Sequence, residues 1–176
     1  MLKQQLPKLA AFALIAAFSH AAMAADGTIN FQGDITDSTC SVSPGSQNKL
    51  VYLGKVTNTK FTGVGSMSEP ATFTIDLLDC NTATLKNAQV TFSGTQDGDH
   101  LAIANSGQVG VPTASGVAIQ LKDSADATIK LGTPSAKYAL GPGTNSLQFK
   151  ANYIATQAAV TTGQANGVAQ FTVAYN

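Results

Sequence analysis

Few side chains in this sequence of 176 residues could act as acids, bases or nucleophiles, and none lies in a recognisable catalytic pattern. Histidine occurs twice, as His20 in a stretch that we expect to be removed and as His100. A Ser-His-Asp site needs a histidine held beside an activated serine. His100 instead follows the turn-forming sequence Asp97-Gly98-Asp99. We therefore predict that His100 is a surface-loop residue and not a catalytic base.

The other candidate motifs are incomplete. The two aspartates before His100 lack the spacing and closing glutamate of an EF-hand calcium loop. The Gly-Val-Gly sequence at 63–65 lacks the lysine of a phosphate-binding loop. Asp76 and Asp79 suit a solvated strand end better than the carboxylate pair of a glycosidase. One histidine cannot supply a multi-histidine metal site of the copper–zinc dismutase type. The sequence thus predicts no catalytic, cofactor-binding or metal-binding residues, and no enzyme.

The first 24 residues have the parts of a secretory signal peptide. Lys3 and Lys8 give a positive start, Leu9–Phe18 is apolar, and Ala22 and Ala24 are the small residues that a signal peptidase requires. Ten apolar residues are too few for a bilayer span, which takes about 20. We expect cleavage after residue 24. Removing 24 of the 176 residues leaves 152, the size of one domain.

Cys40 and Cys80 are the only cysteines. An even number of cysteines in an exported chain favours a disulfide bond, whereas a redox or metal pair would need closer spacing and further ligands. We predict one structural disulfide between Cys40 and Cys80. Closing a loop of this length restricts the unfolded chain and stabilises the fold by about 4 kcal/mol in the chain-entropy model.

The exported part carries little net charge. Arginine is absent, and two of the ten lysines lie in the signal peptide, which leaves eight lysines against ten acidic residues and a formal charge of −2. Nucleic acids and anionic membranes bind clustered lysine and arginine, and no such cluster occurs. We therefore expect neither nucleic-acid binding nor direct membrane insertion.

Short alternating apolar runs separated by turn residues fill the exported part, and no 3.6-residue period persists. The alternation is clearest in Phe73–Leu77, Val117–Leu121 and Leu147–Tyr153, whose apolar side chains we expect to face the core. The predicted strands are Thr28–Thr36, Leu50–Val56, Ala71–Asp79, Ala88–Ser93, Leu101–Ala104, Gly116–Leu121, Ala127–Leu131, Ser146–Ala155 and Val168–Tyr175. Their number and spacing predict a single all-β domain, an immunoglobulin-like β-sandwich.

The first predicted strand has one apolar face. Ile29, Phe31, Gly33 and Ile35 alternate with polar residues ahead of Cys40. Gly33 interrupts the apolar face, as glycine does where another backbone comes close.

The last predicted strand ends at the C-terminus. Phe171, Val173 and Tyr175 alternate with polar or small residues, and only Asn176 follows them. No residues remain to form a further strand beside this one.

These features resemble the pilins of the bacterial chaperone–usher pathway, in particular the type 1-like major fimbrial subunits. The resemblance rests on segments spread over the whole exported chain and on a C-terminal pattern, a glycine fourteenth from the end with a penultimate tyrosine. The segments are Gly27–Gly33, Thr39–Val42, Ile75–Cys80 and Phe149–Thr156, and the C-terminal pattern is Gly163 with Tyr175.

The resemblance implies an incomplete immunoglobulin-like sandwich that lacks its last strand and is completed by donor-strand exchange, a named mode of strand addition. A groove beside the last strand would bind a periplasmic pilus chaperone and then, at the outer-membrane usher, the extension of the next subunit. The donor residues implied are Ile29, Phe31, Gly33 and Ile35, and the groove-side residues are Gly163, Phe171, Val173 and Tyr175.

The same resemblance implies three parts of the chain: a signal peptide (1–24), a donor-strand extension (25–37) and a pilin domain (38–176). It implies a structural subunit, the major rod subunit, of a homopolymeric fimbria that is exported through the periplasm to the cell surface and supports adhesion. A sugar-binding tip adhesin is disfavoured, because it would carry an additional lectin domain and no extension. A minor adaptor subunit would share the domain, extension and groove, and the sequence leaves that alternative open.

Overall fold

The computed structural model describes residues 29–30, 33, 39–103 and 110–176. Thr36–Asn176 form one compact unit, and the fold is that of this unit. Ile29, Asn30 and Gly33 belong to a separate unit and are exposed. The other residues of the predicted strand Thr28–Thr36 lie outside the described residues.

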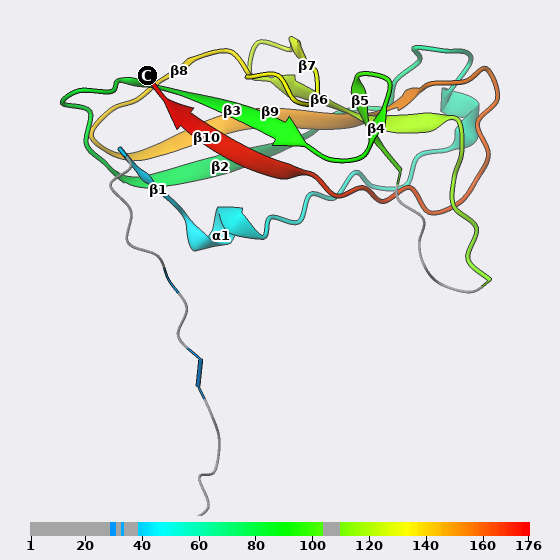
Figure 1. Cartoon of the computed structure of the whole chain (residues 1–176). Helices are drawn as coiled ribbons and strands as arrows, with labels where there is room; N and C mark the ends of the chain where they lie inside the picture. The colour runs from blue at the N-terminus through cyan, green and yellow to red at the C-terminus, as the bar shows by residue number, and fades with distance from the viewer. Residues whose placement is uncertain (1–28, 31–32, 34–38, 104–109) are drawn as a thin grey trace, which may run out of the picture. The chain divides into compact units, whose positions relative to one another are not determined.

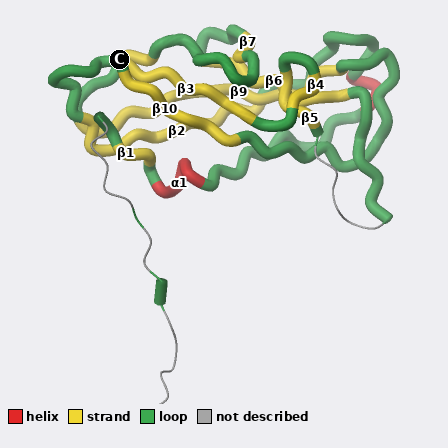
Figure 2. The backbone as a smooth tube through the Cα atoms, viewed as in Figure 1, coloured by secondary structure: helices red, strands yellow, loops and turns green. Residues whose placement is uncertain are grey.

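Two antiparallel sheets make up the compact unit, as Figures 1 and 2 show. The larger sheet has the order β1-β2-β9-β6-β5-β4, with β7 also paired to β6, and the smaller has the order β10-β3-β8. The strands are β1 (Ser41–Val42), β2 (Ala71–Cys80), β3 (Asn87–Ser93), β4 (Gln96–Asp97), β5 (His100–Ala102), β6 (Val117–Asp123), β7 (Thr128–Ile129), β8 (Tyr138–Ala139), β9 (Gly143–Ala155) and β10 (Gln170–Tyr175). The predicted all-β class is confirmed.

The core lies between the two sheets and follows the predicted alternation. Ile75 on β2, Ile119 on β6 and Leu147 on β9 are buried. Phe149 is fully buried, and its ring centroid lies 5.1 Å from that of Phe92 on β3, in the opposite sheet. Edge-to-face aromatic pairs of this kind add to the stabilisation that comes from burying apolar area.

A single helical turn, α1 (Pro44–Gln47), carries the chain away from the larger sheet after β1. The Ser43 amide donates to the Asp76 carbonyl oxygen at 2.9 Å, and the Asp76 amide donates to the buried Ser46 Oγ at 2.9 Å. These two bonds occupy the backbone N–H and C=O groups that Asp76 directs toward the β1 side of β2. The residues after Ser43 therefore leave this edge of β2.

The structure contradicts two of the sequence-based predictions. Leu50–Val56 is not a strand, because none of the described segments forms a backbone ladder with it. His100 is not in a surface loop: it is the first residue of β5 and only partly exposed. The turn sequence before it does form the predicted turn, between β4 and β5, with Gly98 at a φ of 62°.

The helical elements are short. Besides α1, a 3-10 turn, η1, covers Asn58–Lys60. In the part of the chain that the structure describes, no helix has the length and apolar character to cross a membrane.

Candidate functional site

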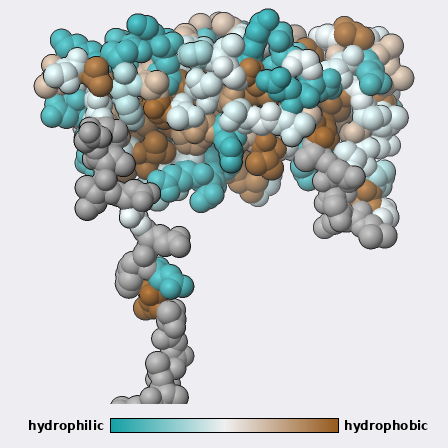
Figure 3. All heavy atoms as spheres, viewed as in Figure 1, coloured by the Kyte–Doolittle hydropathy of each residue, from teal (hydrophilic) through white to brown (hydrophobic). Residues whose placement is uncertain are grey.

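An apolar groove of about 1000 Å³ opens beside β10. One wall is the segment from Ser46 to Leu53, and the other is the segment from Gly167 to Thr172, which includes the start of β10. Figure 3 shows apolar residues, in brown, reaching the surface of the face that carries β10.

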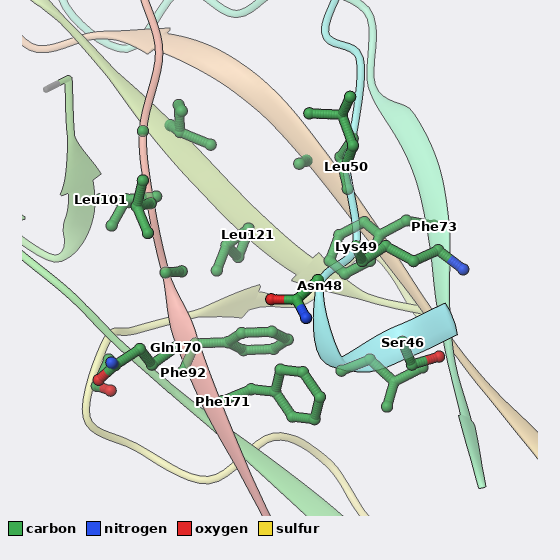
Figure 4. A pocket seen from close by; sticks show the side chains of 18 of the residues that line it. Ser46, Asn48, Lys49, Leu50, Phe73, Phe92, Leu101, Leu121, Gln170 and Phe171 are labelled. Atoms are coloured by element: carbon green, nitrogen blue, oxygen red, sulfur yellow. The ribbon is translucent and has the colours of Figure 1, made fainter. Parts of the chain in front are cut away.

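The floor of the groove comes from five strands of the core. It is formed by apolar side chains that the larger sheet and β3 present between the walls. These are Phe73, Ile75, Phe92, Leu101, Ile119, Leu121 and Ala151. Figure 4 shows Leu121 between the two walls, with Leu101, Phe92 and Phe171 toward the β10 side and Leu50 on the other.

The groove exists because β10 has a neighbour on one edge only. Asn176 and Asn87 exchange both backbone bonds, at 3.0 and 2.9 Å. Hydrogen-bonded and non-hydrogen-bonded pairs alternate in an antiparallel ladder. With the observed register, the backbone N–H and C=O groups of Phe171, Val173 and Tyr175 therefore point away from β3 and toward the groove. Among the described residues, no strand pairs with this edge.

The same parity sets the side chains of β10. Phe171, Val173 and Tyr175 are half-buried and pack against the core, whereas Gln170, Thr172 and Ala174 are exposed. β10 thus offers unpaired backbone groups at its edge and apolar side chains toward the interior.

The opposite wall has the matching alternation without the matching ladder. Val51 and Leu53 are half-buried, while the Leu50 side chain is 70 % exposed. None of the described segments forms a backbone ladder with this wall. The sequence pattern identified this segment as extended but gave no sign that its strand partner would be missing.

The lining of the groove is mainly apolar. Lys49 is the one charged residue among those that line it. No group of three or more His, Cys, Asp or Glu side chains that could hold a metal ion occurs among the described residues.

The predicted groove-side residues separate into two places. Phe171 lines the groove, and Val173 and Tyr175 continue the same strand. Gly163 does not belong to β10 and does not line the groove. An added Cβ at Gly163 would lie 2.4 Å from the Ala114 nitrogen, so this glycine permits close contact between two backbone segments.

The penultimate residue ties the end of the chain to the disulfide. The Tyr175 hydroxyl donates to the Cys40 carbonyl oxygen at 3.3 Å. Burial raises the pKa of this phenol, so Tyr175 stays a neutral donor. Cys40 is bonded to Cys80, as the sequence predicted, and this bond links β1 to the end of β2.

The predicted donor residues fall largely outside the description. Ile29 and Gly33 are described, both exposed, and the Ile29 side chain is 78 % exposed. Phe31 and Ile35 lie outside the described residues. The donor assignment of these four residues stays a prediction.

Residues 29–176 match the family described as "Fimbrial protein". The chain is 40 % identical over 168 residues to a "Probable major fimbrial subunit LpfA" of Escherichia coli O157:H7, covering 95 % of this chain and 93 % of the relative. It is also 40 % identical over 152 residues to a "Type-1 fimbrial protein, A chain" of Salmonella typhi, covering 85 % and 82 %.

Solved structures give the same result for the fold. A type I fimbria protein of Burkholderia pseudomallei has a TM-score of 0.58 at 38 % identity, with 85 % of this chain and 97 % of that chain covered. The P pilus rod subunit PapA has a TM-score of 0.64 at 22 % identity, with 79 % and 100 % covered, and supports the fold alone. The compact unit is thus an immunoglobulin-like sandwich that lacks one strand, with its open edge at β10. The match over 148 of the 176 residues and the full-length relatives lead to one conclusion: this chain belongs to the fimbrial protein family and is a non-enzymatic subunit of a surface fimbria.

Proposed function

We propose that the groove beside β10 binds the N-terminal extension, residues 25–37, of a neighbouring copy of this chain. The observation that carries the proposal is the open edge of β10 above an apolar floor. An exposed edge of this kind drives unspecific association unless a strand covers it. The same chain supplies a fitting strand, because its extension has one apolar face.

The dimensions of groove and extension agree. Seven extended residues, from Ile29 to Ile35, span roughly 23 Å at about 3.3 Å per residue. The segment from Gly167 to the end of β10 at Tyr175, which contains this wall, has nine residues and spans roughly 30 Å on the same basis. Burying the side chains of Ile29, Phe31 and Ile35 would stabilise the complex by about 1.5–3 kcal/mol each, as an upper estimate.

The position of Gly33 sets the register of the incoming strand. With Ile29, Phe31 and Ile35 directed into the groove, Gly33 is the one inward position without a side chain. In this register Gly33 would lie where the groove leaves no room for a side chain. A larger residue there would hold the strand away from the β10 edge and weaken every backbone bond near it.

The assembly route follows from the same edge. A subunit with an open groove needs a temporary strand until its neighbour arrives, and a periplasmic pilus chaperone is the partner that would supply it. Delivery to the growing fimbria would take place at an outer-membrane usher. The signal peptide 1–24, the extension 25–37 and the pilin domain 38–176 are the three parts that this route uses.

Within the fimbria we assign the chain to the rod as its major subunit. The support is the 40 % identity to a relative named as a probable major fimbrial subunit, which covers nearly the whole of both chains. Repeated self-donation produces a homopolymer, since every copy carries both an extension and a groove. Such a rod would support adhesion by holding other subunits away from the cell.

The test is binding and polymerisation of the exported chain. A labelled peptide with the sequence 25–37 should bind the subunit and slow its polymerisation, as followed by fluorescence anisotropy and electron microscopy. The Gly33→Asn peptide should fail to do either. The Asn30→Gln peptide is the matched control, because residue 30 faces outward, and it should behave like the wild type. A subunit that stays monomeric and ignores the wild-type peptide would disprove the proposal.

A further inference from the structure

Three polar side chains form a row across three neighbouring strands of the larger sheet. Gln120 on β6 lies directly opposite Asn152 on β9. Leu101 on β5 lies opposite Ile119, and continuing this antiparallel register by one residue places His100 opposite Gln120. The row His100–Gln120–Asn152 therefore crosses β5, β6 and β9 in order.

Each member of this polar row has a buried atom without a partner. These atoms are His100 Nδ1, Gln120 Oε1 and Asn152 Oδ1, and no hydrogen-bond partner for them exists among the residues that the structure describes. The Gln120 and Asn152 side chains belong to residues only 6 % and 2 % exposed. Buried polar atoms are rarely left unpaired, because each unpaired atom destabilises the fold.

The orientation of the Asn152 amide is fixed by its nitrogen atom. Asn152 Nδ2 donates to the Tyr153 carbonyl oxygen at 3.1 Å. Turning this amide over would place its oxygen against a carbonyl oxygen, which cannot donate, so Asn152 Oδ1 keeps its unpartnered position. Gln120 Nε2 donates to Thr128 Oγ1 at 3.3 Å, and because a hydroxyl can also donate, this bond does not fix the Gln120 amide.

The row lies on the face of the sheet opposite the groove. Side chains alternate between the two faces of a strand. Each member of the row has a sequence neighbour that lines the groove. These neighbours are Leu101 beside His100, Ile119 beside Gln120 and Ala151 beside Asn152. The polar row is therefore directly behind the floor of the groove.

We propose that the polar row binds ordered water, one molecule between His100 and Gln120 and another between Gln120 and Asn152. Amide oxygens only accept hydrogen bonds, whereas an imidazole nitrogen accepts or donates according to its tautomer. A bridging molecule must therefore donate to Asn152 Oδ1 and be able to donate to or accept from Gln120 and His100. Water does this, and two hydrogen bonds of about 2.8 Å span the spacing of about 4.8 Å between adjacent strands.

Local charge favours water over a metal ion. The adjacent cross-strand pair on this face is Lys122 with Lys150, and Asp126 accepts from Lys150 Nζ at 2.8 Å. Lys122 is opposed by no carboxylate in the described part of the chain at ion-pair distance. Two ammonium groups next to the row repel a bound cation but leave a neutral ligand unaffected.

The neighbour of β6 also changes at this location. The strand β5 is paired with β6 as far as Ile119, and β7 is paired with it from Leu121, which lies opposite Ile129. Asp99 Oδ2 and Lys130 Nζ, 2.9 Å apart, close the junction between these two strands. A break between consecutive neighbours gives the sheet room for solvent that an uninterrupted ladder lacks.

The experiment is magnetisation transfer from water to the side-chain amide protons of Gln120 and Asn152 in the labelled, exported subunit, together with a high-resolution crystal structure. Long-lived water signals at both amides, and density that bridges the oxygens, are expected. Gln120→Met keeps the volume but removes the acceptor, and it should abolish the signal at Asn152. Gln148→Met, at an exposed position of β9, should leave it unchanged.

Two results would overturn the proposal. One is a structure in which the three atoms bond directly to protein groups with no water signal. The other is density with the short contacts or anomalous scattering of a metal ion. Recording the wild-type spectra with the groove empty and with the 25–37 peptide added separates this question from the proposed function, since the water is expected in both samples. The wild-type spectra decide the matter even where a variant fails to fold.

Discussion

Gly163 has a role that its place in the C-terminal pattern does not reveal. An added Cβ would come within 2.5 Å of the Thr113 carbonyl carbon as well as close to the Ala114 nitrogen. The Ala114 amide donates to the Gln164 carbonyl oxygen and the Gln164 amide donates to the Pro112 carbonyl oxygen, both at 2.8 Å. The glycine thus allows two segments to bond directly ahead of β10.

Gly163→Ala should therefore destabilise the subunit by about 1–3 kcal/mol, the range for overpacking a filled site. Urea unfolding of the subunit gives the measurement. Gly63→Ala is the control, because nothing lies within 4 Å of an added Cβ there and its φ is not in the left-handed region. That variant should unfold within about 0.5 kcal/mol of the wild type. Equal stability of both variants would contradict the close approach.

The ion pair between Asp126 and Lys150 makes the stability of the subunit depend on pH in the acid range. The hydrogen bond and charge of Lys150 hold the pKa of Asp126 below its ordinary value of 3.8. A depressed carboxyl pKa contributes stability that is present above the unfolded value and is lost as the pH falls through the folded value. The contribution is therefore full at neutral pH and disappears only below about pH 4.

Replacing Lys150 by Met should raise the pKa of Asp126 toward 3.8, because both the bond and the charge are removed. Carboxyl-carbon NMR titration of the subunit between pH 2 and 6 follows that group directly. Lys137→Met provides a control without an ion pair to Asp126. An unchanged titration of Asp126 in Lys150→Met would show that the pair does not persist in solution.

At the scale of elements, side-chain alternation and backbone pairing proved to be different properties. Alternation located β2, β6 and β9, because each of these strands buries one row of side chains in the core. Leu50–Val56 alternates as well, yet it is not a strand. No described segment of the compact unit forms a ladder with it, and a pattern of side chains carries no information about backbone pairing.

The candidate site was predictable only in part for the same reason. Phe171 was visible as an apolar residue of the predicted strand Val168–Tyr175. The floor was not, because Leu101, Ile119 and Ala151 carry the same signal as any core residue. Their position beneath a gap depends on which strands the topology leaves unpaired.

Hydrogen exchange of backbone amides tests whether a strand pairs with the two walls of the groove. Adding the 25–37 peptide should protect the amides of Phe171, Val173 and Tyr175, whose N–H groups point toward the groove. The amides of Thr172 and Ala174 already face β3 and should change little, so β10 contains its own control. Equal protection of all five amides would indicate general stiffening and not the addition of a strand.

The same experiment should also protect backbone amides in the other wall of the groove. Leu50–Leu53 has an extended conformation without a ladder, and a strand in the groove would give its amides partners. Protection should therefore appear at alternate residues of this segment as well. Its absence, with β10 protected, would mean that the incoming strand pairs on one side only.

At the scale of the whole molecule, the disulfide is the only covalent bond between distant parts of the described chain. Cys40 and Cys80 are 40 residues apart, and the Tyr175 hydroxyl bond adds the last strand to the same region. Replacing both cysteines by alanine should lower the free energy of unfolding by about 2–4 kcal/mol. Thermal or urea unfolding measures the loss. Dithiothreitol should lower the stability of the wild type and leave the variant unchanged.

The disulfide also determines how a fimbria made of such subunits would carry mechanical tension. A pull on the extension enters the compact unit at Cys40, next to β1, which has only two residues paired to β2. So short a strand would peel off under load. The Cys40–Cys80 bond transmits the pull past β1 into the end of β2, which is paired with β9 through most of its length. A reduced fimbria should therefore fail at lower force than an oxidised one, with each subunit yielding at its first strand.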